Sequence, residues 1–215
     1  MKKPITYMLL VVGGVIAGLI IAGLIITAMG YSIFDRTNNI PALSAKADNA
    51  ELTALAFSVA EDIKEGDFLS LSQIAHPEYG VVFSPYATVM LSTDKCFQAE
   101  QIAAFKDDNK LYVWGLYNGS GEPIELTVAD YFNEFVFNRD YTSASVIGIN
   151  RIVRSGNALE NLTDIFPDVQ FVDFYIPGGE KDSAEDCTWN SMRLGFEEYE
   201  GSLRLTVILH SEWAE

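Results

Sequence analysis

The side chains best suited to bind a ligand or a metal ion are two histidines, each followed two positions later by a glutamate. His76 opens His-Pro-Glu78, and His210 opens His-Ser-Glu212. Residues two apart on a strand share a face, so two such pairs that met in the fold could hold a divalent metal. The pattern is short, however, and a histidine on a closing strand is commonly a hydrogen-bonded structural residue. We therefore expect no metal site and no cofactor.

An aspartate inside an apolar strand is the next candidate, as a general acid or base. Asp173 lies within VQFVDFYI, where apolar neighbours can shift the pKa of a carboxyl group. The alternative is that Asp173 lies on the polar face of a half-covered strand. Ser84 lacks the context of a serine nucleophile, and the glycines near Glu122 lack the lysine of a phosphate loop. We name no catalytic residue.

A ligand site is the remaining possibility for these side chains. A fold that brings the N-terminal helices over a C-terminal strand could place both histidines at one pocket with aromatic side chains. The residues that we expect to line such a site are His76, Tyr86, Trp114, Asp173 and His210.

The two cysteines, Cys96 and Cys187, allow one intramolecular disulfide. In an oxidising compartment this bond would close a loop of about 90 residues and stabilise the fold by about 4 to 5 kcal/mol in the chain-entropy model. We expect the bridge to form. A disulfide requires the two Cα atoms to lie close together in the fold. The alternative is that the two cysteines are unrelated free thiols.

A long apolar segment places these residues in a cell compartment. Residues 5–29 form an uncharged run of 25 residues, about 37 Å as a helix, which is enough to cross a hydrocarbon core of about 30 Å. Lys2 and Lys3 precede it, so the positive-inside rule places the N-terminus in the cytoplasm. We expect a single-pass anchor in the cell membrane with an extracellular or periplasmic domain. The alternative is a signal peptide cleaved before Tyr31.

The anchor divides the chain into three parts. Residues 1–30 form the cytoplasmic tip and the membrane helix, 31–48 a linker, and 49–215 one extracytoplasmic domain. Gly14 and Gly18 form a G-x-x-x-G motif through which two helices could pack as a homodimer, although glycine is also common in membrane helices.

Charge and composition limit the partners of the outer part. After Met29 there are 30 acidic and 12 basic residues, a net charge of −18. Such a surface repels nucleic acid and favours cationic partners, so we exclude nucleic-acid binding. The 13 Phe, 10 Tyr and 3 Trp argue for a packed core.

Residue periodicity and turn signals predict an α+β domain of helices packed on a bent antiparallel sheet. Asp48, with Glu51, is expected to cap a helix that ends at Gly66. Further helices are expected at 68–75, at 99–105, after Thr127 and after Asn157, and strands at 80–84, 87–91, 110–117, 144–153, 169–176, 192–199 and 203–210. We expect Leu203, Leu205, Val207 and Leu209 to share one face. The order of elements is similar to the NTF2-like cone, and a cystatin-like or new arrangement stays open.

Several spaced motifs resemble an uncharacterised family of bacterial surface domains, often lipoproteins. They are HPEYGVVFSPY from His76, Trp114-Gly115, GSGEPIELT from Gly119, the expected helix from Tyr131 to Phe137, Gly156-Asn157 with Asn161, RLGFEEYEG from Arg193, and the closing His210 and Trp213. In this chain a membrane helix stands in place of the lipoprotein cysteine of that family. The resemblance implies a location in the bacterial envelope and gives no activity.

Two classes of function remain. The first is a binding or scaffold domain that recognises an envelope component or a protein partner, and the second is a small-molecule isomerase, hydratase or hydrolase with an NTF2-like pocket. A deep pocket holding Asp173 or His210 beside Trp114 favours the enzyme, and a filled core with an exposed aromatic patch favours the binder.

The predicted topology can be tested by proteolysis. Protease added outside intact cells or protoplasts should digest the domain from residue 49 onward and leave a protected N-terminal fragment, because Lys2 and Lys3 lie in the cytoplasm. Immunoblotting of an N-terminal tag measures the fragment. Protection of the whole domain, or a mature N-terminus at Tyr31, would contradict the expected anchor.

Overall fold

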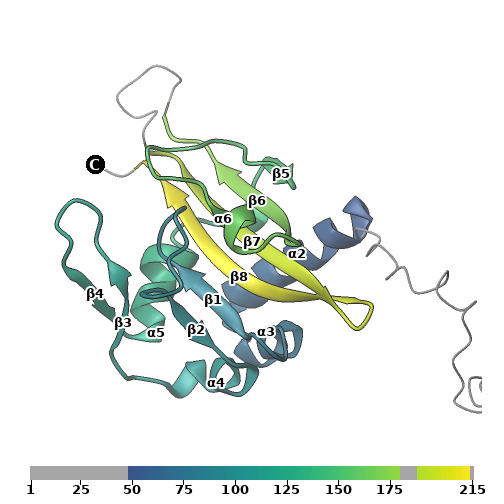
Figure 1. The fold of residues 1–215 in the computed structure, drawn as a ribbon, viewed down its shortest axis with the longest axis horizontal. Coiled ribbons are helices and arrows are strands. Elements are labelled where there is room, and N and C mark those ends of the chain that lie inside the picture. Colours follow the sequence, from purple (N-terminus) through teal and green to yellow (C-terminus); the bar gives the residue numbers. More distant parts are fainter. Residues whose placement is uncertain (1–47, 180–187, 214–215) are drawn as a thin grey trace, which may run out of the picture. The chain divides into compact units, whose positions relative to one another are not determined.

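The computed structural model describes residues 48–179 and 188–213, which form a mixed α+β unit (Figure 1). The helical elements are α2 (Asn49–Glu65), α3 (Phe68–Ile74), α4 (Ala99–Ala103), α5 (Val128–Tyr131) and α6 (Leu162–Ile165), with short helical turns η1 (Phe105–Asp107), η2 (Phe132–Val136) and η3 (Tyr141–Ser143). The strands are β1 (Val81–Ser84), β2 (Lys95–Phe97), β3 (Tyr112–Leu116), β4 (Pro123–Leu126), β5 (Val146–Ile149), β6 (Gln170–Ile176), β7 (Asn190–Tyr199) and β8 (Ser202–Glu212). The predicted α+β class is confirmed.

The first long helix, α2, forms where its caps predict. The Asp48 side chain accepts a hydrogen bond from the Ala50 N–H at 3.4 Å, and Gly66 ends the helix in the left-handed conformation with φ 66°. Its apolar stripe lies against the sheet, where Phe57 meets Phe174 edge to face at 5.0 Å. The stripe comprises Leu52, Ala56, Val59, Ala60 and Ile63.

Six strands form the main sheet in the order β2-β1-β8-β7-β6-β5, and β3 and β4 form a separate hairpin. The meander from β5 to β8 is antiparallel, as expected, and β7 turns into β8 at Glu200 and Gly201, both with positive φ. The expectation of a wholly antiparallel sheet is wrong, because β1 runs parallel to β8. More than 100 residues separate these two strands, so no tight turn fixes their direction.

A β-bulge at Thr206 separates β8 into two parts that bury different faces. Phe196 pairs with Leu205, but the preceding Gly195 pairs with Val207, so Thr206 is the extra residue. The expectation that Leu203, Leu205, Val207 and Leu209 share a face is therefore wrong. The inserted residue reverses the alternation, so Leu203 and Leu205 join the larger core while Val207 and Leu209 join the smaller one.

The two faces of the sheet have different covers. The helix face carries Phe174 and Ile208 and packs against α2 and η2. The loop face carries Val82 and Leu209 and packs against the segments around residues 86–91 and 150–169. Both faces are thus buried.

Some predicted elements differ from those observed. Residues 87–91 have irregular backbone rather than forming a strand, and the short helix α6 begins after Asn161 instead of Asn157. The Asn161 side chain explains the first difference, because it accepts from Val89 N at 2.8 Å and donates to Val89 O at 3.0 Å, which satisfies the backbone without a sheet. It does not cap α6, because the Asn161 side chain makes no hydrogen bond to the first turn of that helix. Strands β2 and β4 were not predicted, since three or four residues give little alternation.

The interior beneath the helix face is filled by aromatic side chains. The ring centroid of Phe83 lies 5.9 Å from the ring centroids of Phe97, Phe105 and Trp114. Trp114 is fully buried, and its ring stacks on Tyr131 at 3.8 Å with an interplanar angle of 6°. This cluster joins the main sheet to the β3–β4 hairpin and to α5.

The predicted anchor and linker lie outside the described residues, as do Gly14 and Gly18. Within residues 48–179 and 188–213, no helix is both long and apolar enough to span a bilayer. The anchor therefore stays a prediction from the sequence.

The close packing at Gly195 gives a stability test. An added Cβ would lie 2.5 Å from Val207 Cγ1 and 2.9 Å from Val169 Cγ2, so Gly195→Ala should lower the free energy of unfolding by about 1 to 3 kcal/mol. Urea denaturation followed by tryptophan fluorescence measures this. Gly201→Asn is the control, because no atom lies within 4 Å of its Cβ position and asparagine tolerates positive φ. Equal stability of both variants would contradict the packing.

Candidate functional site

His210 lies near the end of β8, on the helix face. Only 1% of the residue is exposed, and its ring lies 6.1 Å from that of Phe135 on η2. Its Nε2 atom lies 3.3 Å from Oε2 of Glu212, as expected for residues two apart on a strand. The contact does not meet hydrogen-bond geometry, and among the residues that the structure describes neither ring nitrogen of His210 has a hydrogen-bond partner.

Asn190, the register partner of Glu212 on β7, completes the contact. Its Nδ2 donates to Glu212 Oε2 at 2.8 Å, and its Oδ1 is buried with no hydrogen-bond partner in the described part of the chain. The contact with His210 lowers the pKa of Glu212, against the opposing effect of burial, and Asn190 and the more distant Arg139 lower it further. Glu212 is the exposed member of the group, with 37% of its side chain accessible.

Two tyrosines extend this group toward the β3–β4 hairpin. The Tyr86 hydroxyl accepts from Asn118 N at 3.3 Å, and its ring meets Phe135 at 5.8 Å. Burial raises the pKa of Tyr86, and the carboxylates of Glu212 and Glu134 raise it further. Tyr117 donates to Glu134 at 3.1 Å. We call this set the β8-end cluster: Tyr86, Tyr117, Glu134, Asn190, His210 and Glu212.

Trp114 supports the β8-end cluster from the core rather than lining a site. Its Nε1 donates to Leu126 O at 3.0 Å, and its ring stacks on Tyr131. Tyr131 in turn lies 5.3 Å from Phe135, which touches both Tyr86 and His210. Three of the five predicted residues are therefore connected through Phe135.

His76 lies elsewhere, in the turn between α3 and β1. The backbone N–H of His76 donates to Leu205 O. The ring atom Nδ1 accepts from the backbone N–H of Glu78 at 3.3 Å and of Tyr79 at 3.1 Å. Burial lowers the pKa of His76, although Glu78 opposes the shift. Leu205 is five residues before His210, about 15 Å along the strand, so the two histidines do not share a pocket.

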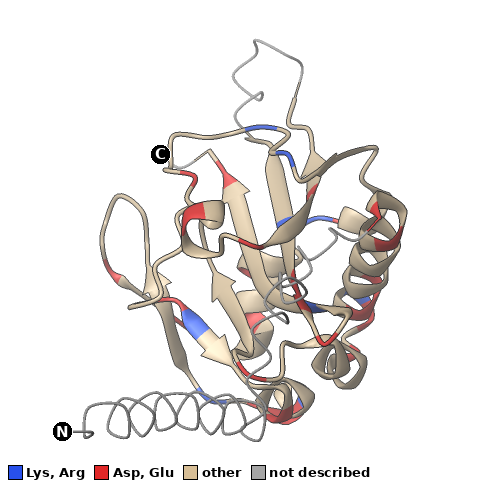
Figure 2. Cartoon of the chain, turned by 45° about the vertical axis from the view of Figure 1, so that its right-hand side comes forward, with Lys and Arg blue, Asp and Glu red and all other residues tan. Residues whose placement is uncertain are grey.

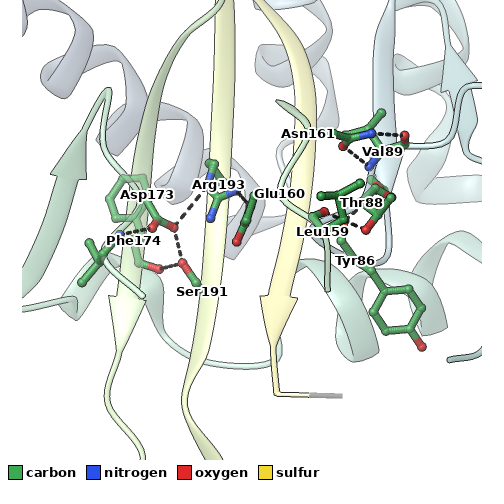
Figure 3. Close-up of polar contacts among 12 residues, drawn as sticks. Tyr86, Thr88, Val89, Leu159, Glu160, Asn161, Asp173, Phe174, Ser191 and Arg193 are labelled. Carbon is green, nitrogen blue, oxygen red and sulfur yellow. Dashed lines mark hydrogen bonds and ion pairs between the residues drawn. The ribbon is translucent and has the colours of Figure 1, made fainter. Parts of the chain in front are cut away.

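Asp173 lies on the opposite, loop face of the sheet, in a buried polar network (Figure 3). It accepts hydrogen bonds from Ser191 Oγ and from Val153 N, the latter at 2.8 Å, and its Oδ1 lies 3.6 Å from Arg193 Nε. Arg193 also donates to Glu160 at 2.7 Å. Both Asp173 and Arg193 are fully buried, so the loop segment covers the face that the sequence suggested was half-exposed.

A second set of contacts in Figure 3 ties the two loop segments to each other. Thr88 Oγ1 donates to Leu159 O at 2.7 Å, next to the reciprocal hydrogen bonds between Val89 and Asn161. These bonds satisfy the backbone of segments that have no strand partner. The loop face is accordingly a structural layer in which polar side chains pair with each other.

Cys96 lies on β2, where its thiol donates to Tyr79 O at 2.9 Å. Partial burial raises the pKa of this thiol. Cys187 is outside the described residues, so the disulfide stays a prediction.

A separate cleft of about 290 Å³ lies between the end of α2 and η2. Its lining includes the rings of Phe68, Phe132 and Phe137, and none of the residues predicted for a ligand site. Within residues 48–179 and 188–213, no three His, Cys, Asp or Glu side chains lie together in a way that could hold a metal ion.

Sequence reasoning missed three members of the β8-end cluster. His210 and Tyr86 were expected, and Glu212 was noted through its spacing from His210. Asn190, Tyr117 and Glu134 come from three other segments, and only the pairing of β7 with β8 and the packing of η2 on β8 bring them together.

Comparison with protein-family models, with curated proteins and with solved structures finds no match to this chain. The resemblance to bacterial surface domains therefore stays a prediction.

The loop-face network gives a test of whether Asp173 has a structural role. Arg193→Met leaves two carboxylates without their cation, so it should lower the free energy of unfolding by about 3 to 5 kcal/mol. Lys64→Met removes the exposed ion pair with Asp140 and should cost less than about 1 kcal/mol. Denaturant titration measures both. Equal, small losses would count against the structural role of Asp173.

Proposed function

We propose that this protein is a binding or scaffold domain, held outside the cytoplasm by its N-terminal membrane helix in the bacterial envelope. The main support is that two of the residues predicted to line a ligand site are buried in the structural core, whereas other polar side chains stay accessible. Trp114 is fully buried in stacked aromatic packing, and Asp173 is fully buried beside Arg193. The side chains that stay accessible are the carboxylates and tyrosines of the β8-end cluster.

We also propose that the α+β domain has an NTF2-like cone fold. A bulged β8 and a sheet covered by α2 agree with an NTF2-like cone, since bulges bend strands. The aromatic side chains of the core fill the space that such a cone can enclose. A filled cone favours binding at the rim over catalysis in a pocket, and the isomerase, hydratase or hydrolase becomes the less favoured proposal.

The acidic surface agrees with this location and limits the partner. Figure 2 shows acidic residues distributed over helices, strands and loops of the described part, with fewer basic residues between them. The sequence as a whole carries a net charge of −16. The partner should therefore be neutral or cationic where it meets the domain.

Photocrosslinking in intact cells tests the binding function. Asn118 is exposed, and its backbone N–H contacts the hydroxyl of Tyr86, so a p-benzoylphenylalanine at this position borders the β8-end cluster. We expect a discrete crosslinked adduct of the full-length chain, identified by mass spectrometry. Asn109, exposed in the loop before β3, carries the same substitution as the control and should give none. Equal adducts at both positions, or none at Asn118, would count against the proposal.

A further inference from the structure

We propose that the β8-end cluster receives a primary ammonium group, supplied either by a lysine side chain of a partner or by a free alkylamine. This inference rests on the proposed binding function and specifies the chemistry of the ligand. It starts from three adjoining side chains, Asn190, His210 and Glu212, whose hydrogen-bonding capacity is only partly used.

The unused positions in this group are mostly acceptors. Among the described residues, Asn190 Oδ1 and His210 Nδ1 are buried without a hydrogen-bond partner, and His210 Nε2 has only its 3.3 Å contact with Glu212. Glu212 accepts a hydrogen bond through Oε2 alone in this part of the chain. Buried polar atoms in folded proteins almost always have a partner. Other described residues, such as Arg193 and Gln170, also have buried atoms without one, but here such atoms adjoin a carboxylate that is 37% exposed, so they can receive a donor from outside. An ammonium group has three donors and no acceptor, which matches a carboxylate, an amide oxygen and an imidazole nitrogen that can accept.

The arrangement leaves one member of the group open to solvent. Glu212 has 37% of its side chain exposed, whereas only 1% of His210 and 4% of Asn190 are exposed. Both buried residues contact the same oxygen, at 3.3 Å and 2.8 Å. A ligand therefore meets the Glu212 carboxylate first, with the two unpartnered side chains directly behind it.

Charge and aromatic character also favour a cation. Glu212 and Glu134 both act electrostatically on Tyr86, and Tyr117 binds Glu134 directly. The described basic side chain that acts on Glu212 is Arg139, which is exposed and donates to the carbonyl of the adjacent Asn138. Two carboxylates beside two tyrosine rings form a negative surface that attracts an ammonium group and repels an anion.

A divalent metal is the competing occupant, because imidazole and carboxylate are metal ligands. A structural zinc site uses four protein ligands and a catalytic one uses three. The residues that the structure describes contain no cluster of three such ligands, so the ammonium group fits better.

Isothermal titration of the full-length chain in a non-ionic detergent, at constant ionic strength, tests this. The probes are butylammonium chloride, a lysine peptide with blocked termini, tetramethylammonium chloride and zinc chloride. We expect saturable binding of the first two and much weaker binding of tetramethylammonium, which has the charge but no N–H donor. Glu212→Gln should raise the Kd of butylammonium about tenfold, since a charge-assisted hydrogen bond is lost.

The matched control is Glu125→Gln, which removes an exposed carboxylate on β4 and should leave the Kd unchanged. Tighter binding of the lysine peptide than of butylammonium identifies a protein partner as the source, and equal binding identifies a free amine. Equal effects of the two glutamine variants, equal binding of tetramethylammonium, or binding of zinc alone would each overturn the inference. If no amine binds while Asn118 still crosslinks a partner, the ammonium site fails and the binding function stands.

Discussion

The pairing of β7 with β8 determines on which face of the sheet the polar side chains of β8 lie. These are the longest strands described, and their register contains one extra residue, Thr206. Side chains alternate with a period of two, so the bulge reverses the faces of all later residues of β8. Because of it His210 faces η2 and the aromatic core, and without it His210 would share the loop face with Arg193.

The two covers of the sheet bury polar groups in different ways. On the loop face, Asp173 and Arg193 are buried together, because an unpaired buried charge would cost several kcal/mol. That arrangement uses nearly all of the carboxylate, with donors from Ser191, Val153 and Arg193. On the helix face, the carboxylate at the end of β8 stays partly in water, and its buried neighbours have unused hydrogen-bonding positions among the described residues. Arg193 and Glu160 on the loop face also have buried atoms without a hydrogen-bond partner there, but only 16% of the Glu160 side chain is exposed, compared with 37% of Glu212. The second arrangement is therefore the more accessible to a ligand.

Local signals in the sequence were sufficient for some elements and not for others. Asp48 and Gly66 correctly predicted the two ends of α2, and the apolar run around Asp173 correctly predicted strand β6. These signals are sufficient because caps and periodicity depend on only a few neighbouring residues. The spacing of His210 and Glu212 likewise predicted their shared face. The bulge depends on how one strand packs against another. The irregular backbone around Val89 depends on hydrogen bonds with the Asn161 side chain, more than 70 residues away. No local pattern encodes such contacts.

The position of the β8-end cluster follows from the same constraint. At the end of a strand the ladder of backbone hydrogen bonds stops, so a side chain there can remain solvated. The side chain two residues earlier lies on the same face and can already be covered. Glu212 is at this boundary, and Asn190 opposite it is the first residue of β7. Unsatisfied buried polar atoms cost about 1 to 3 kcal/mol each, a cost that the aromatic packing around Phe135 must offset. Other buried atoms of the described residues also lack a hydrogen-bond partner, but those of Asn190 and His210 adjoin the partly exposed carboxylate of Glu212, so a ligand can approach them at this edge.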